Sequence, residues 1–149
     1  MSDNVLRFIP TDANWTPSQD NAAAAAELLQ GMVASSAEIT TSFPDEITFF
    51  DPGGNWSGVE CPACGADAES WFWEAFDEAA SKGFMDLSVT TPCCSKEASL
   101  NTLHYKWPAG FGRFALEALN PGIADTTSEQ VSDLAQCLGS PLTKIWVHI

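Results

Sequence analysis

The sequence predicts an α+β fold: a split-βαβ sheet, antiparallel or mixed, with two helices packed on one face and an inserted zinc ribbon. Three observations support this prediction. Two arms with strand–helix–strand character lie at residues 5–50 and 111–149. Two pairs of cysteines lie between the arms. The 149 residues, 45% of them hydrophobic, suffice for a single domain at 1–149, with the insertion at about 58–96.

The first arm begins with a strand at residues 5–9, where apolar side chains alternate. A helix is expected next, because Thr16 is a good N-cap, Pro17 suits the first helical position and Gln19 completes a capping box. It should extend to about Val33. Its apolar stripe is expected to pack against the sheet and comprises Ala22, Ala25, Ala26, Leu29, Met32 and Val33.

The remaining strands are expected where alternating or β-branched apolar runs are bounded by turn residues: 39–43, 46–50, 84–91, 102–107, 111–119 and 142–149. Pro44-Asp45 forms a turn between the first two of them. A last helix is expected from a cap at Thr127 or Ser128 to about Leu138. Its buried stripe comprises Val131, Leu134, Ala135 and Leu138.

The two cysteine pairs organise the middle of the chain. Cys61-Pro62-Ala63-Cys64-Gly65 has the form of a zinc knuckle, in which a tight turn points backbone N–H groups at sulfur and Gly supplies a positive φ. About thirty residues later, Thr91-Pro92-Cys93-Cys94 offers the second pair. We therefore predict a structural Zn²⁺ site with four tetrahedral thiolate ligands: Cys61, Cys64, Cys93 and Cys94.

Other interpretations of these thiols stay open. All four could be buried core cysteines, as Cys137 is expected to be, whereas disulfides are disfavoured because nothing in the chain indicates export. Adjacent Cys93 and Cys94 can share one metal ion only with a distorted backbone. His104 is therefore the natural replacement if one of them is not a ligand. Cys94 could also be a redox or catalytic thiol.

A helix is expected between the cysteine pairs, at 67–82, ended by Gly83. It carries Trp71, Phe72, Trp73 and Phe76, which can pack on the core or roof the metal site. Alternatively, this helix presents a face that binds a partner, because exposed aromatic side chains mark interfaces. The residues assigned to that face are Glu69, Trp71, Trp73, Glu74, Asp77 and Glu78.

The net charge is −14, from 20 carboxylates against 6 Lys and Arg. Binding to nucleic acid needs clustered basic residues, and the chain has no such cluster, so we exclude a nucleic-acid partner. An acidic surface favours a basic protein partner by electrostatic steering, or serves solubility alone. We expect no membrane segment and no signal peptide, because no run reaches roughly 18 apolar residues and the N-terminus lacks a basic flank before an apolar run. A cytoplasmic location with reduced thiols follows as an expectation.

The run from Cys61 to Phe114 resembles a family of small, acidic, uncharacterised bacterial zinc-ribbon proteins. The shared motifs are CPACG, ESWFWEAF, TTPCC and YKWPAGFGRF. The resemblance implies zinc binding, and it implies a Gly after the vicinal cysteines, where this chain has Ser95. In size, charge and character the chain also resembles immunity proteins that neutralise secreted toxins, which implies a toxin domain as the partner.

The first hypothesis for function is a non-catalytic, zinc-stabilised protein that binds a basic protein through an acidic and aromatic surface. The second is a zinc-dependent hydrolase or transferase, with three Cys ligands, a water and Glu60 or His104 as the base. The third is a structural adaptor subunit, which predicts stable oligomers. The chain has no P-loop, GxGxxG, GxSxG or HExxH motif to favour an enzyme.

Overall fold

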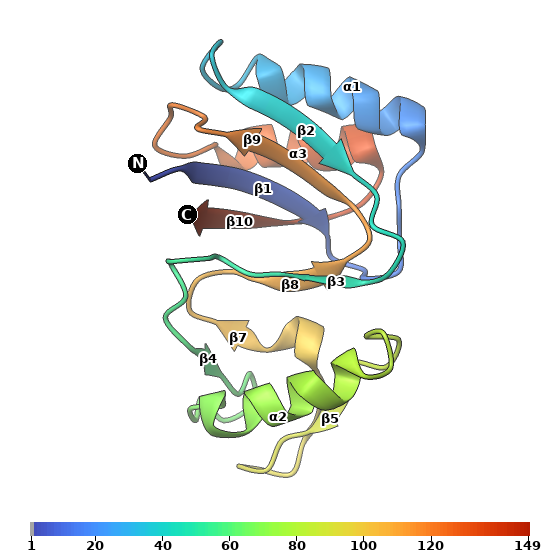
Figure 1. Cartoon of the computed structure of the whole chain (residues 1–149), viewed down its shortest axis with the longest axis vertical. Helices are drawn as coiled ribbons and strands as arrows, with labels where there is room; N and C mark the ends of the chain where they lie inside the picture. The colour runs from blue at the N-terminus through green and yellow to red at the C-terminus, as the bar shows by residue number, and fades with distance from the viewer. Residues whose placement is uncertain (1) are drawn as a thin grey trace.

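The larger sheet is built from both arms of the chain (Figure 1). The computed structural model describes residues 2–149. The first arm comprises β1 (Asn4–Pro10), α1 (Gln19–Gln30) and β2 (Glu38–Ser42), and the second comprises β9 (Ala115–Leu119), α3 (Ser128–Leu138) and β10 (Leu142–His148). The strand order is β10-β1-β9-β2, and all neighbouring strands are antiparallel. This order is a split-βαβ sheet, so the predicted α+β class is confirmed.

Both helices pack on one face of this sheet. Alternation along β1 sends Leu6 and Phe8 to that face, and Val5 and Ile9 to the other. The helical stripes meet the strands in one core, whose fully or nearly fully buried members are Leu6, Phe8, Ala22, Ala25, Leu29, Phe114, Leu116, Ala118, Leu134 and Leu138. Cys137 packs at the margin of this core and is half-buried rather than buried as expected, because it lies beside the buried stripe of α3 and not within it.

The last helix starts as its sequence predicts, and α1 does not. Thr127 and Gln130 form a capping box at the start of α3. In α1 the N-cap is Ser18 rather than Thr16, and its Oγ accepts from the Asn21 N–H at 3.1 Å. Pro17 therefore precedes the cap, where its missing N–H costs no helical hydrogen bond. The helix also ends at Gln30 rather than at Val33, because Gly31 follows and Gly disfavours continuation.

The chain between β2 and β9 folds around a second core. Its elements are β3 (Thr48–Phe50), β4 (Val59–Glu60), α2 (Glu69–Ala80), β5 (Ser88–Thr90), β6 (Glu97–Ser99), a 3₁₀ turn η1 (Leu100–Thr102), β7 (His104–Tyr105) and β8 (Gly110–Gly112). The strands form three two-stranded antiparallel sheets: β3–β8, β4–β7 and β5–β6. Phe72 of α2 is fully buried and packs against Phe49, Trp56 and Tyr105.

Five expected strands are shorter or differently paired, among them the run at 102–107, of which only β7 forms. The run at 111–119 is divided between β8 and β9, because Phe114 turns into the helix-covered core while 110–112 pairs with β3. The strands on either side of Pro44-Asp45 pair with β9 and β8 rather than with each other. The run at 84–91 contributes only β5, since Gly83 and Phe84 both take positive φ and turn the chain. Within residues 2–149, no helix is long and apolar enough to cross a membrane.

Candidate metal centre

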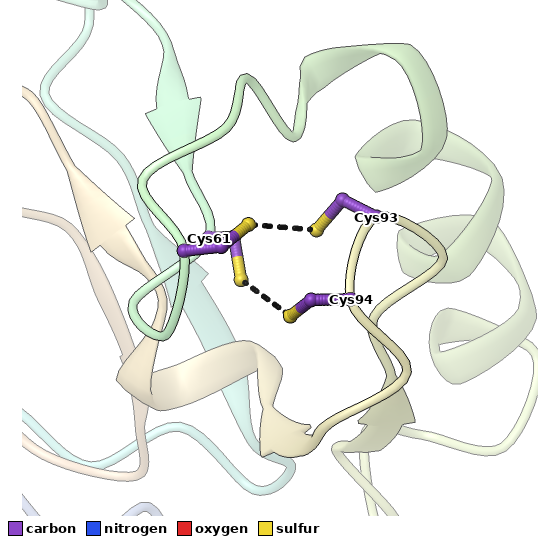
Figure 2. A group of neighbouring side chains, drawn as sticks. Cys61, Cys93 and Cys94 are labelled. Atoms are coloured by element: carbon purple, nitrogen blue, oxygen red, sulfur yellow. Dashed lines mark hydrogen bonds between the residues drawn. The ribbon is translucent and has the colours of Figure 1, made fainter.

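The four predicted ligands come together at one end of the insertion. The Sγ atoms of Cys61, Cys64, Cys93 and Cys94 all lie within 4.8 Å of one another. The Cys64 and Cys93 sulfurs are 3.4 Å apart. The Cys61 and Cys94 sulfurs are 3.8 Å apart, and Figure 2 shows the thiols of Cys61, Cys93 and Cys94 turned toward one centre. A tetrahedral ion with metal–sulfur bonds of about 2.3 Å separates its sulfurs by about 3.8 Å. The cluster could therefore hold a metal ion with little adjustment of the side chains.

The first pair lies on a knuckle that follows β4. The Cys61 N–H donates to the Ala66 carbonyl at 2.8 Å, and the Gly65 N–H donates to the Cys61 carbonyl at 2.9 Å. Gly65 has φ +76°, a conformation that a Cβ disfavours. These two hydrogen bonds close the loop and turn both thiols toward the second pair.

The second pair lies on a knuckle with the same backbone. The Thr91 N–H donates to the Lys96 carbonyl at 2.8 Å, and the Ser95 N–H donates to the Thr91 carbonyl at 2.8 Å. Ser95 has φ +56°, so it adopts the conformation of Gly65 despite its side chain. The motifs CPACG and TPCCS therefore correspond position by position, and Thr91 is the counterpart of Cys61.

This correspondence explains how adjacent cysteines reach one centre. Thr91 is fully buried at the place of the first thiol, where its Oγ1 lies 3.3 Å from the Cys94 Sγ. The same oxygen accepts from the Lys96 N–H at 3.1 Å, which fixes the turn. Cys93, one residue before Cys94, supplies the fourth thiol instead. Sequence reasoning missed the role of Thr91, although aligning Pro62 with Pro92 would have revealed it.

The surroundings of the four thiols differ. The backbone N–H of Cys64, against partial burial, lowers the pKa of Cys61 to about 6. Desolvation and the neighbouring thiols raise the pKa of Cys93 to about 12. Cys61 is buried, whereas Cys64 and Cys93 are exposed and Cys94 is half-buried. Solvent therefore reaches the cluster from one side.

The alternative ligand and the fifth cysteine lie elsewhere. His104 stands opposite Glu60 in the β4–β7 pair, with 2.9 Å between His104 Nδ1 and Glu60 Oε1. Its side chain is 65% exposed. The cluster of possible ligands among the described residues includes neither His104 nor Cys137. The four-cysteine set is therefore the one that the fold assembles.

The predicted partner-binding residues of α2 differ in their exposure to solvent. Trp73 is 44% exposed, and Glu74, Asp77 and Glu78 are exposed beside it. Trp71 and Glu69 are only half-buried, and Glu69 accepts a hydrogen bond from the Trp56 indole at 2.6 Å. Helical spacing puts the two tryptophans at opposite edges of the solvent-facing side, with the carboxylates of Glu74, Asp77 and Glu78 between them.

Comparisons of the chain with protein-family models, with curated proteins and with solved structures found no match. The likeness to bacterial zinc-ribbon proteins and to immunity proteins stays a prediction.

Proposed function

We propose that the chain is a non-catalytic binding protein whose insertion is held by one structural zinc ion. Four thiolates at tetrahedral spacing are a ligand set that suits Zn²⁺. The ion would join the loop after β4 to the β5–β6 hairpin, two segments separated by the whole of α2. Such a site requires reduced thiols, which places the protein in the cytoplasm under this proposal.

The observation that carries the binding role is the solvent-facing side of α2. The helix buries Phe72 completely and yet leaves Trp73 44% exposed next to three exposed carboxylates. Exposed aromatic side chains with a polar surround are typical of protein interfaces. The net charge of −14 would steer a basic protein toward this surface.

The partner under this proposal is a basic protein, such as a toxin domain that the chain neutralises as an immunity protein. An inhibitor of this kind needs surface complementarity and fast association, both of which an acidic surface supplies. It needs no catalytic group. A complete set of four thiolates also leaves no coordination position for a reactive water, which favours this role over a zinc hydrolase.

The test compares what three immobilised proteins retain from an extract of the native host. One is the zinc-loaded wild type, and the second is the triple variant Glu74→Gln, Asp77→Asn, Glu78→Gln. We expect the wild type to retain one basic protein in a one-to-one ratio, and we expect the variant with the three α2 substitutions not to retain it. A triple variant with the same charge change on α1 and α3 (Asp20→Asn, Glu27→Gln, Asp133→Asn) is the control. Retention that is equal on all three proteins would refute the assignment.

A further inference from the structure

The insertion contains a groove between α2 and the β5–β6 hairpin. It is a cavity of about 400 Å³ whose walls are one side of α2 and the length of β5. From α2, Trp71, Glu74 and Glu78 line it, and Ser88 and Thr90 line it from β5. This volume lies within the range of pockets that take a small ligand or a short segment.

Among residues 2–149, no strand pairs with the edge of β5 that borders this groove. In the hairpin, the Leu100 N–H donates to the Leu87 carbonyl and the Thr91 N–H donates to the Lys96 carbonyl. Because antiparallel pairs alternate, Val89 bonds across to Ala98, while the backbone groups of Ser88 and Thr90 point away from β6. The Ser88 N–H is held by the Asp86 carboxylate at 3.0 Å. The Thr90 N–H and the carbonyls of Ser88 and Thr90 remain free to pair with another strand.

The charges along the groove favour a cationic occupant. Glu74, Glu78 and Asp86 line it together with one ammonium group, that of Lys82. These three carboxylates outnumber the one ammonium group, so the groove carries a net negative charge formed by Glu74, Glu78 and Asp86. The Trp71 ring beside them offers a face for a Lys or Arg stem.

Trp71, which lines the groove, also carries a polar atom that the described part of the chain does not satisfy. Its Nε1 is buried and has no hydrogen-bond partner. A buried donor without an acceptor is unfavourable.

We infer that an extended, basic segment of the partner protein adds to the free edge of β5 as a third strand of the hairpin. Its backbone pairs with Thr90 and Ser88, and its alternate Lys or Arg side chains face Glu74 and Glu78. This inference rests on the proposed binding function and specifies how the partner is held. It also brings the partner next to the metal centre, since Thr90 immediately precedes the second knuckle.

The experiment uses the zinc-loaded full chain and a short synthetic peptide in which Lys alternates with Val. Amide chemical shifts are followed by NMR up to about 1 mM peptide, where even a millimolar Kd gives half occupancy. We expect shifts centred on Ser88–Thr90 and on Glu74 and Glu78. The same peptide with Glu in place of Lys should produce none of them.

Two variants with matched controls test the mode of binding. Thr90→Pro removes the outward N–H at a position that makes no ladder bond to β6, and we expect it to weaken the peptide by about ten-fold relative to Thr90→Val. Glu74→Gln with Glu78→Gln should weaken it similarly, whereas Glu27→Gln with Asp133→Asn should not. Zinc content confirms that each variant keeps the adjacent knuckle.

Equal binding by the Pro and Val variants would overturn the strand-addition model. So would shifts confined to Trp73 and Asp77, although that pattern would support the acidic surface of α2 as the binding site. A peptide that shifts neither region also overturns strand addition. The extract experiment above judges the binding function on its own, because retention of a basic protein by the wild type does not depend on how that protein is held.

Discussion

Moving the fourth thiol from position 93 to position 91 tests whether the two knuckles correspond position by position. The perturbation is a pair of proteins: Cys93→Ala, and Cys93→Ala with Thr91→Cys. The first leaves three thiols. The second restores four, in the CxxC spacing of the first knuckle, because Thr91 is the counterpart of Cys61.

The size of the effect follows from the geometry. Structural zinc sites are worth about 10–16 kcal/mol in apparent binding free energy, so one thiolate of four contributes about 3 kcal/mol, or about 100-fold in Kd. Cys93→Ala should weaken zinc by this factor. The Thr91 Oγ1 already lies 3.3 Å from the Cys94 Sγ, close to the 3.8 Å between the Cys61 and Cys94 sulfurs. A thiol at position 91 should therefore recover most of the lost affinity.

The assay is competition for zinc against a chromophoric chelator, with the Co²⁺ spectrum as a count of thiolate ligands. Cys93→Ala with Ser132→Cys is the control for the number of thiols. Ser132 is exposed on α3, which packs on the four-stranded sheet and lies outside the insertion that carries the cysteine cluster. This control protein should bind zinc as weakly as Cys93→Ala alone. If the Thr91→Cys protein is no tighter than this control, the two knuckles are not equivalent.

Three further outcomes follow from the fold. Chelation of the metal should lower hydrogen-exchange protection at Phe72 before it does so at Leu116, because these residues belong to separate cores; simultaneous loss at both would contradict this. Ser95→Gly should raise the free energy of unfolding by about 0.5–1 kcal/mol in urea, since Ser95 has φ +56°; an unchanged or lower value would show that the turn is not strained. Although partial burial opposes it, hydrogen bonds from Lys144 and Thr126 lower the pKa of Asp125. The stabilisation is present above the ordinary pKa of about 3.9 and is lost as pH falls through the lowered value. Asp125→Asn should accordingly cost about 0.5 kcal/mol at pH 7 and nothing at a pH below that value, and a difference that persists in acid would refute this account.

Local patterns were enough to predict the helices, the faces of the long strands and the thiol set. Apolar spacing identifies the side of α3 that carries Leu134 and Leu138, since a helix buries the residues that share a face. The knuckle at Cys61–Gly65 is equally local, because its turn depends on its own Gly and its own hydrogen bonds. Such features need no knowledge of distant segments.

Pairing partners and strand breaks were not predictable in the same way. The alternation of Phe114, Leu116 and Ala118 predicts one strand over 111–119, yet the chain leaves one sheet and enters another around Arg113 and Phe114. The break occurs because Phe114 is fully buried in the core beneath the helices, which is a tertiary contact that the local sequence does not specify. Likewise, Thr16 and Ser18 are similar N-caps on either side of a proline, and tertiary placement decides between them.

Ser42 and Ala115 are direct cross-strand partners at the ends of β2 and β9. The whole insertion that carries the four cysteines is therefore, topologically, the loop of a single hairpin. It contacts the sheet through Phe50, which packs with Ile9 and Ala115 on the face that the helices leave open. It also contacts the end of β10, where the Gly54 N–H donates to the His148 carbonyl and the His148 N–H donates to the Pro52 carbonyl. Under the proposed binding function, changes on the outer side of α2 would alter what the protein recognises while the register of the four-stranded sheet stays the same. The recognition surface and the scaffold would then be able to evolve separately within one short chain.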